Sequence, residues 1–510
     1  MIISLSVLVI TIIVSGTYAL YKAQLSKNIG VNTTTHGLAY YINYVKGTDI
    51  TAATLNPSTS YEGGASSDIE FWKKDDSYDI YGKIELTVNT IGTNLSNSPA
   101  LKYAVVNNGN VLKEGSLKGT TSGSKVTILK NLYLEQTKQI YTVYVWLDNS
   151  EELGNISNES LSISVDCTAS LQKEPTAADT IISLYTSAAK VTATNNSITY
   201  NTAPSVSLMN DRLGGTTTDL DGGNIRYYGA NPNNYIYFNC SDYSNQTSST
   251  CETWRIIGVF DGKLKLIRGS QIGKYSWDNK NISTGAENNS GKNDWTTARL
   301  MKLLNPSNYY KVDSNDNNLG QSLYYNSASG KCYSGQNNAT VDCDFTSTGI
   351  KNAETRNMIA ETTYNLGGWN SNSVYSNQIY EYERGTTVYS GRPTTWKGKI
   401  ALAYPSDYGY AADLNQCKDK TLYDYDNRTC TSNNWMKAII TNNGSNTGWL
   451  LTPNSGNSYY AWYVDSVGYV SNYSIAYSAF GAVPVLSLSS ELGIESGGDG
   501  SSSKPYKLSA

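Results

Sequence analysis

Residues 140–147 read IYTVYVWL, an uninterrupted run of aromatic, aliphatic and β-branched residues. Such a run is typical of a strand that is covered on both faces. Further β-branched or aromatic runs occupy 38–45, 78–88, 101–106, 125–132 and 161–167, and Gly, Asn and Ser turns separate them. Short strands that are punctuated by turns predict an all-β sandwich, which we place at residues 28–170.

The composition suits an extracellular β-rich protein. The chain of 510 residues contains 42 tyrosines, and only 16% of its residues are charged. Tyrosine and threonine fit pleated strands, whereas asparagine and glycine fit turns. The formal net charge is −4 and no basic patch is evident, so nucleic acid is excluded as an expected partner.

The first residues predict export from the cytoplasm. Residues 2–20 (IISLSVLVITIIVSGTYAL) are free of charge, and Lys22 and Lys27 follow them. A run of this length can nearly cross a bilayer as a helix, or it can be the apolar part of a signal peptide that is cleaved after Ala19. We therefore assign residues 1–27 to a signal peptide or a membrane anchor, and we expect the remainder on the cell surface.

The cysteines support an oxidising compartment. Six of the seven form neighbouring pairs, separated by 11, 11 and 13 residues, and each pair encloses a polar, turn-rich loop. This spacing predicts three local disulfides, Cys240–Cys251, Cys332–Cys343 and Cys417–Cys430. Zinc is the weaker interpretation, because no C-x-x-C motif occurs and His36 is the only histidine. Cys167 is left over, either as a buried thiol or for an intermolecular bond.

A helix is predicted after the sandwich. Residues 174–190 (EPTAADTIISLYTSAAK) have helical periodicity, and Thr176 can cap their first turn. We interpret residues 171–220 as a helical linker. Two more helices are predicted at 295–304 and 353–362. Residues 493–510, which include SGGDGSSS, are predicted to form a flexible tail.

The C-terminal half carries motifs that occur together in one family. They are NYIYFNC (234–240), CETWRIIGVFDGKLKLIRGS (251–270), NDWTTARLMKLLNP (293–306), YEYERGTTVYSGRPTTWKGKIALAYPSDYGYA (380–411) and WLLTPNSGNSYYAWYVDSVGYV (449–470). In this order they resemble the surface proteins of gut Firmicutes that carry the domain called DUF6273. The resemblance covers residues 221–492.

That resemblance implies an α+β, C-type-lectin-like fold with long disulfide-stapled loops. Relatives of the formylglycine-generating enzyme and the variable proteins of diversity-generating retroelements share this fold. One departure concerns the last motif, where the family has Gly-Val-Arg-Pro-Val. Here Ala482 is followed by Val483 and Pro484, so the arginine is absent.

The stretch 459–480 is the candidate ligand-binding face. It combines six tyrosines with Ser, Ala, Asn and Asp, the mixture that antibody-like paratopes use. The alternative is that the tyrosines pack and cap strands. These residue types are also reached by changing adenines in Asn codons, so the stretch is a candidate hypervariable cassette. The candidate binding residues are Tyr459, Tyr460, Trp462, Tyr463, Asp465, Tyr469, Asn472, Tyr473, Tyr477 and Phe480.

Catalytic patterns are sparse, and we predict that the protein is not an enzyme. With His36 as the only histidine, the C-terminal half cannot form a Ser-His-Asp or Cys-His site. Formylglycine-type oxidation needs paired reactive cysteines, whereas these cysteines are assigned to loop-closing pairs. A glycosidase would need two facing carboxylates, for which the candidates are Glu381, Glu383, Asp407 and Asp413.

No metal site or cofactor is predicted, and calcium is left open. Asp313, Asn315 and Asn317 begin like a calcium loop, but Gly is missing at its sixth position and Glu at its twelfth. Plain Asn/Asp turns are the simpler interpretation. Five arginines lie in the family motifs, and we expect them to pair with buried acids; they are Arg255, Arg268, Arg299, Arg384 and Arg392.

The sequence thus favours an adhesin- or receptor-like display protein whose partner is an extracellular protein or glycan. Its membrane contact would run through residues 1–27. Two alternatives stay open. One is a structural fibre or pilus-like subunit, because GTYALYKAQ (16–24) and YTVYVWLDNS (141–150) resemble camelysin-like and biofilm-fibre proteins. The other is an extracellular carbohydrate-active enzyme.

Overall fold

A computed structural model describes residues 23–25, 41–51, 55–151, 153, 155–156, 159–212, 223–243, 245–279, 289–311, 320–335 and 338–509. The chain forms two compact units, Met1–Glu174 and Pro175–Ala510. Of the segment assigned to a signal peptide or anchor (1–27), residues 1–22, 26 and 27 lie outside the described residues, as does His36, whereas Ala23–Leu25 form a strand of the first unit. Within the described residues, no helix is both long enough and apolar enough to cross a bilayer.

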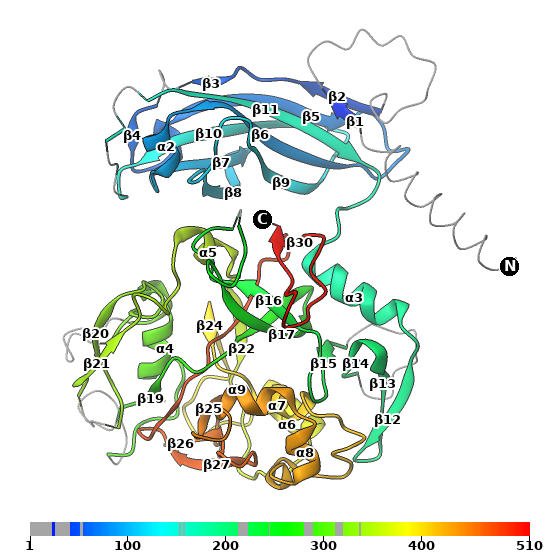
Figure 1. The fold of residues 1–510 in the computed structure, drawn as a ribbon, viewed down its shortest axis with the longest axis vertical. Helices are drawn as coiled ribbons and strands as arrows, with labels where there is room; N and C mark the ends of the chain where they lie inside the picture. The colour runs from blue at the N-terminus through cyan, green and yellow to red at the C-terminus, as the bar shows by residue number, and fades with distance from the viewer. Residues whose placement is uncertain are drawn as a thin grey trace, which may run out of the picture. The chain divides into compact units, whose positions relative to one another are not determined.

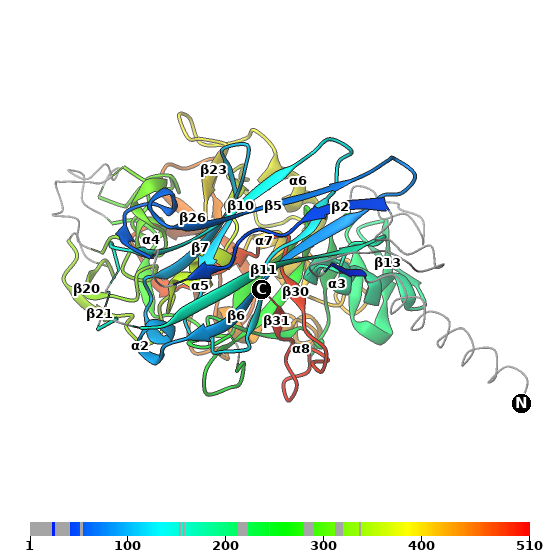
Figure 2. The same cartoon turned by 90° about the horizontal axis from the view of Figure 1, so that it is seen from above.

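The first unit contains two sheets (Figure 1 and Figure 2). One has the order β1 (Ala23–Leu25), β11 (Leu161–Ser170), β6 (Tyr81–Ile91) and β9 (Lys125–Tyr133), with β3 (Ile50–Thr51) also paired to β11. The other has the order β2 (Ile42–Val45), β5 (Ala65–Lys73), β10 (Ile140–Asp148), β7 (Leu101–Asn107) and β8 (Asn110–Ser116), with β4 (Pro57–Ser58) paired to β10. A short helix, α2 (Thr93–Asn97), precedes β7.

Alternating side chains from the two sheets share one core. Phe71 of β5, Leu86 of β6 and Val143 of β10 are all fully buried in it. On the other face of its sheet, Trp146 of β10 packs with Ala104 and Val106 of β7. The predicted β-rich, sandwich-like arrangement is therefore confirmed. The second face of β10 is covered only in part, because Trp146 is buried there whereas Ile140 is 44% exposed. Cys167 is a buried free thiol in the same core.

The second unit is built on an antiparallel sheet of nine strands. Eight of them follow the order β12 (Val191–Asn195), β13 (Ile198–Ala203), β14 (Leu208–Asn210), β15 (Ile225–Tyr227), β17 (Glu252–Phe260), β18 (Lys263–Arg268), β29 (Val485–Ser487) and β24 (Ile400–Ala401). The ninth, β16 (Tyr235–Phe238), pairs with the first half of β17.

The expectation of a helical linker at 171–220 needs correction. The helix α3 (Ala177–Ser187) forms, and Thr176 caps it by accepting from the Asp179 amide at 3.1 Å. However, Ile181 and Tyr185 are buried in the core of the second unit, and β12 to β14 belong to its main sheet. Burial of the helix's apolar stripe makes this segment part of the second unit rather than a connection.

Short helices and small sheets surround the main sheet. The helices are α4 (Arg299–Leu304), α5 (Ala353–Met358), α6 (Ser376–Arg384), α7 (Pro405–Tyr410), α8 (Arg428–Ser432) and α9 (Trp435–Ile440). Of these, α4 and α5 lie where helices were predicted. Two small sheets of two strands pair β20 (Ser329–Cys332) with β21 (Val341–Asp344), and β22 (Thr362–Asn365) with β23 (Thr395–Gly398).

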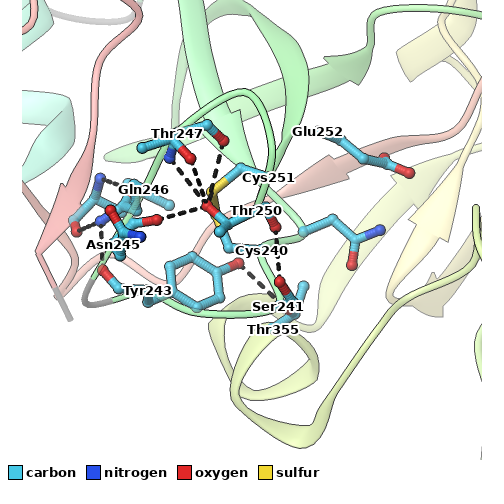
Figure 3. Close-up of a disulfide and its surroundings, with 12 residues drawn as sticks. Cys240, Ser241, Tyr243, Asn245, Gln246, Thr247, Thr250, Cys251, Glu252 and Thr355 are labelled. Atoms are coloured by element: carbon cyan, nitrogen blue, oxygen red, sulfur yellow. Dashed lines mark hydrogen bonds between the residues drawn. A yellow bond between two sulfur atoms is a disulfide. The ribbon is translucent and has the colours of Figure 1, made fainter. Parts of the chain in front are cut away.

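The three predicted disulfides are confirmed, and the first one anchors the end of the chain. In the loop between Cys240 and Cys251, the Tyr243 hydroxyl lies 3.1 Å from Oγ1 of Thr355 (Figure 3). Nε2 of Gln246 donates to the Leu508 carbonyl at 2.7 Å, and the Leu508 amide donates to Oε1 of Gln246 at 2.9 Å.

The tail expected to be flexible at 493–510 is instead part of the second unit. Its strands β30 (Gly493–Ile494) and β31 (Leu508–Ser509) pair with each other. Tyr506 is buried and exchanges backbone hydrogen bonds with Tyr235 and Tyr237 of β16. The glycines and serines form tight turns here, because Gly497 and Gly500 have positive φ values of 106° and 74°.

Candidate functional site

The candidate stretch forms the edge of a second sheet in this unit. Its order is β19 (Lys274–Ser276), β28 (Ala479–Gly481), β25 (Gly448–Pro453), β26 (Tyr460–Val464) and β27 (Val470–Ile475). A turn closes the β26–β27 hairpin, where the Gly468 amide donates to the Asp465 carbonyl at 2.9 Å. Gly468 has φ +114°, a conformation that glycine tolerates.

Asp465 builds this turn. Its Oδ1 accepts from the Val467 amide at 3.0 Å, and its amide donates to the Tyr469 carbonyl at 2.9 Å. The turn is also held from below, because the buried Tyr408 hydroxyl donates to the Gly468 carbonyl at 2.8 Å. Asp465 is half-buried, so the structure assigns it mainly to turn geometry.

Two candidate binding residues do not reach the surface. Trp462 and Asn472 are both 0% exposed. Trp462 shares a core cluster with Val464 and Val470 because side chains two residues apart in a strand point to the same face. The carbonyl of Asn472 accepts from Nδ2 of Asn454 at 2.9 Å. Both residues therefore support the hairpin from the inside.

The remaining aromatic candidates are half-buried or exposed. Tyr473 is 55% exposed, whereas Tyr459, Tyr460, Tyr463, Tyr469, Tyr477 and Phe480 are of intermediate exposure. Tyr463 lies opposite Ser471 in the hairpin, and Tyr473 follows Ser471 by two residues. The register then shifts, because Ser474 lies opposite Ala461, so the alternation of side chains is interrupted between Ser471 and Ser474.

Several of these rings meet in two strings. In the first, Tyr460 contacts Tyr459 and Tyr473, with centroid distances of 4.9 Å and 6.1 Å. In the second, Tyr463 contacts Phe480 at 5.4 Å, and Phe480 contacts the buried Trp449 at 4.6 Å. Edge-on and tilted contacts at such distances add to the apolar packing of each ring.

One aromatic residue of this site, Tyr423, was not predicted from the sequence. Tyr423 is 57% exposed, and its ring lies 5.9 Å from that of Tyr469. It lies in the loop that the Cys417–Cys430 disulfide closes, and its backbone amide donates to the Asn372 carbonyl at 3.2 Å. The Tyr-rich sequence of this loop (KDKTLYDYDNRT) was the available signal.

We call the seven residues that make these contacts the aromatic face. They are Tyr423, Tyr459, Tyr460, Tyr463, Tyr469, Tyr473 and Phe480. Tyr477 is half-buried in the turn after β27, where its carbonyl accepts from Oγ of Ser276 at 2.7 Å.

The Tyr469 hydroxyl is neutral at physiological pH. Its pKa is raised to about 12, mainly by burial, and the neighbouring Tyr463 and Asp465 act in the same direction. The protonated phenol can both donate and accept hydrogen bonds.

The acids that could serve a glycosidase lie elsewhere, and two of them are buried. Asp407 is 1% exposed and pairs with Lys265 and, at 2.9 Å, with Nη1 of Arg226. Glu383 is 0% exposed; it accepts from the Ser406 amide at 2.9 Å and pairs with Arg384 at 3.2 Å.

The turn at Asp313, Asn315 and Asn317 lies outside the described residues. Among the residues that the structure does describe, no three His, Cys, Asp or Glu side chains are grouped so that they could hold a metal ion.

Comparisons with known proteins add little. No family model matches the chain, and no curated protein matches it. An acetyl xylan esterase from the rumen bacterium Butyrivibrio proteoclasticus aligns at 11% identity over 27% of this chain and 35% of its own, with a TM-score of 0.14. The receptor binding domain of a botulinum neurotoxin mosaic serotype C/D aligns at 12% identity over 52% and 75%, with a TM-score of 0.15. Such low scores support no argument about fold or function.

Proposed function

We propose that this chain is a bacterial cell-surface binding protein that presents the aromatic face to an extracellular protein or glycan. The observation that carries the proposal is that partly exposed tyrosines meet here in pairs. Tyr460 of β26 contacts Tyr473 of β27, and Tyr469, just before β27, contacts Tyr423 of the Cys417–Cys430 loop. The second unit is a C-type-lectin-like domain of the DUF6273 type in this proposal, and the first unit is the part that holds it away from the envelope.

Tyrosine suits such a face for a physical reason. Its ring offers a large contact area with few rotatable bonds, and its hydroxyl provides a directional hydrogen bond. Residues of this type dominate the energetics of many protein interfaces. Tyr423 and Tyr473 are more than half exposed, so their rings are available without any rearrangement.

The scaffold under the rings is stiff. Trp462, Val464 and Val470 fix the hairpin to the core, and a disulfide fixes the loop that carries Tyr423. A pre-organised surface loses less conformational entropy when it binds, which raises affinity. The rigid support therefore favours recognition over a purely structural role for the tyrosines.

The disulfides and the apolar residues near the start of the sequence also support an extracytoplasmic location. Three disulfides favour an oxidising compartment, as expected for an exported protein. The apolar residues 2–20 supply the export signal or the membrane anchor in this proposal.

A glycan and protein array that is probed with the full chain tests the proposal. We expect at least one ligand to bind the wild type and to bind a Tyr473→Ala variant at least tenfold more weakly. Tyr78→Ala is the matched control, because Tyr78 is an exposed tyrosine (44%) of the first unit. Ligands that bind all three proteins equally would show that the aromatic face is not the binding site.

One observation favours the fibre as a second candidate. The short strand β1 pairs antiparallel with β11, with Ala23 opposite Ala169 and Leu25 opposite Cys167. A short terminal strand of this kind can pair instead with β11 of another copy, as in strand exchange. Electron microscopy of the full chain tests this: regular polymers that disappear when residues 23–25 are deleted would support it, and monomeric particles would reject it.

A further inference from the structure

A pocket of about 450 Å³ lies in the second unit, where the first half of β17 meets β16, the end of β18 and α9. It shares no lining residue with the aromatic face. Its volume is within the range of pockets that take small organic ligands. The lining residues are Tyr235, Glu252, Thr253, Arg255, Arg268, Gly269, Ser270 and Ile439.

Arg255 is the unusual residue in this pocket. It is only 7% exposed, yet no carboxylate in the described part of the chain lies within ion-pair distance of its guanidinium. Its Nε donates to Oδ1 of Asn234, and its Nη2 donates to the Pro232 carbonyl at 3.2 Å. A guanidinium has five N–H donors, so these two neutral acceptors leave donors for a ligand.

The other buried arginines nearby differ in this respect. Arg268 is paired with Glu252, with two N–H···O contacts of 3.1 Å. Arg226 is paired with Asp407 at 2.9 Å and also with Asp211. We expected Arg255 to pair with a buried acid, and among the described residues it does not. Arg268 and Arg226 do form such pairs.

The surroundings hold the Arg255 guanidinium in place without neutralising it. Its central carbon lies 3.6 Å from the ring centroid of Tyr235 and 4.9 Å from that of Trp435. Stacking on aromatic faces compensates part of the desolvation of a cation. Burial nevertheless lowers the pKa of Arg255 to about 10, so at neutral pH the side chain is still charged, and the residues that the structure describes provide no counterion for it. A buried charge of this kind is stabilised when an anion binds beside it.

The charges around the pocket indicate which anion would fit. Arg268 and Glu252 cancel each other, which leaves the single positive charge of Arg255. A monoanion would be balanced, whereas a dianion such as phosphate would carry an uncompensated charge close to Glu252. The planar fork of a guanidinium also matches the two oxygens of a carboxylate.

The geometry points to a site for a small organic monocarboxylate, with its carboxylate on Arg255 and its body between Tyr235 and Ile439. The hydroxyl groups of Thr253 and Ser270 line the same pocket and provide hydrogen bonds for the polar groups of that body. This site is separate from the aromatic face and does not depend on the proposed function.

Isothermal titration calorimetry of the full chain tests the site with four probes. Glucuronate is an acidic sugar, N-acetylalanine is a carboxylate from another source, glucose is a neutral sugar, and inorganic phosphate is a competing anion. We expect at least one carboxylate to bind, and to bind at least tenfold more tightly than glucose and phosphate. Preference for glucuronate or for N-acetylalanine then identifies the source of the carboxylate.

Variants at Thr253 make the test independent of folding. Thr253 is exposed and lies two residues from Arg255 on β17, so both side chains are on the same face of the strand. Thr253→Glu places a tethered carboxylate at the mouth of the pocket, and we expect it to weaken binding of the carboxylate probe at least tenfold. Thr253→Gln has nearly the same shape as Thr253→Glu without the charge, and we expect it to bind the carboxylate probe more tightly than Thr253→Glu does.

Further variants separate charge from shape. Arg255→Lys keeps the charge but removes the fork, and we expect at least tenfold weaker binding, whereas the exposed Arg428→Gln leaves binding unchanged. The inference is overturned if the folded wild type binds neither carboxylate, if glucose binds as tightly as glucuronate, or if Thr253→Glu binds as the wild type does.

Discussion

The rings of Tyr423 and Tyr469 lie 5.9 Å apart, although the two residues belong to separate segments of the second unit. Tyr469 follows the turn of the β26–β27 hairpin, and Tyr423 lies in the loop between Cys417 and Cys430. The loop that the Cys417–Cys430 disulfide closes thus places the exposed ring of Tyr423 beside the tyrosines of the hairpin. This relationship links the cysteine pattern of the sequence to the proposed binding site.

Replacing Tyr423 with alanine is expected to weaken ligand binding without unfolding the protein. Because the side chain is 57% exposed, the free energy of unfolding should change by no more than about 0.5 kcal/mol. Removal of an interface tyrosine that contributes strongly is expected to cost about 2 kcal/mol of binding free energy, a loss of roughly 30-fold in affinity. Urea unfolding and titration with the ligand found on the array measure the two quantities. Unchanged affinity would exclude Tyr423 from the site.

Opening the Cys417–Cys430 loop should affect binding in the same direction. In the chain-entropy model, a disulfide that closes a loop of this size contributes about 3 kcal/mol to stability. Replacing both cysteines with alanine is expected to lower the free energy of unfolding and to release Tyr423. The matched control replaces Cys332 and Cys343, which close another loop of the same unit. We expect a similar loss of stability there but full binding, and equal binding losses in both variants would contradict this explanation.

Local signals predicted much of the fold. The runs of β-branched residues predicted the strands of the first unit, and Thr176 correctly predicted the start of α3. The 11- and 13-residue spacings predicted the disulfides because a bond across a short loop depends mostly on residues close in sequence. Features of this kind need no knowledge of distant contacts.

Features that depend on distant contacts were not predicted. Trp462 and Tyr463 are adjacent and both aromatic, but only the pairing of β26 with β27, which includes an irregularity between Ala461 and Tyr463, places Trp462 in the core. The Gly/Ser-rich tail is ordered by Gln246, which lies more than 250 residues earlier in the chain. That no described carboxylate lies beside Arg255 depends on how distant segments of the unit are placed.

The two sides of the hairpin should respond differently to alanine. Trp462→Ala removes a fully buried side chain and is expected to lower the free energy of unfolding by about 3–5 kcal/mol. Tyr473→Ala removes a ring that is 55% exposed, so its effect on stability should stay below about 1 kcal/mol while binding is lost. Chemical unfolding of both variants measures this contrast. Equal stability losses would mean that Tyr473 is a packing residue.

The Gln246 side chain should hold the C-terminal strand in place. Gln246→Ala removes two hydrogen bonds to the backbone of Leu508 and leaves its buried carbonyl and amide without these partners. We expect a loss of about 2 kcal/mol in the free energy of unfolding and faster hydrogen exchange at residues 504–509. Ser248→Ala, at an exposed position of the same loop, is the control. Exchange that does not change in Gln246→Ala would show that β31 is held by other contacts.

The buried Glu383 predicts a pH dependence of stability. Burial raises the pKa of Glu383 from its ordinary value of 4.5 to about 7, although Arg384 and Ser406 act in the opposite direction. Between these two values the unfolded chain has lost the proton while the folded protein retains it. The contribution of Glu383 to stability should therefore be largest below about pH 4.5 and should fall by roughly 3 kcal/mol as the pH rises to about 7.

Comparison with Glu383→Gln isolates this contribution. Glutamine keeps a carbonyl that can accept from the Ser406 amide, but it does not titrate between pH 4.5 and 7. We expect the free energy of unfolding of the variant to vary less with pH across this window. Asp278, whose pKa burial raises from 3.8 to about 6, leaves a smaller decline in both proteins. Urea unfolding at intervals between pH 4.5 and 8 provides the two curves. If they run parallel, Glu383 is already ionised in the folded protein at pH 4.5, and its partners outweigh the effect of burial.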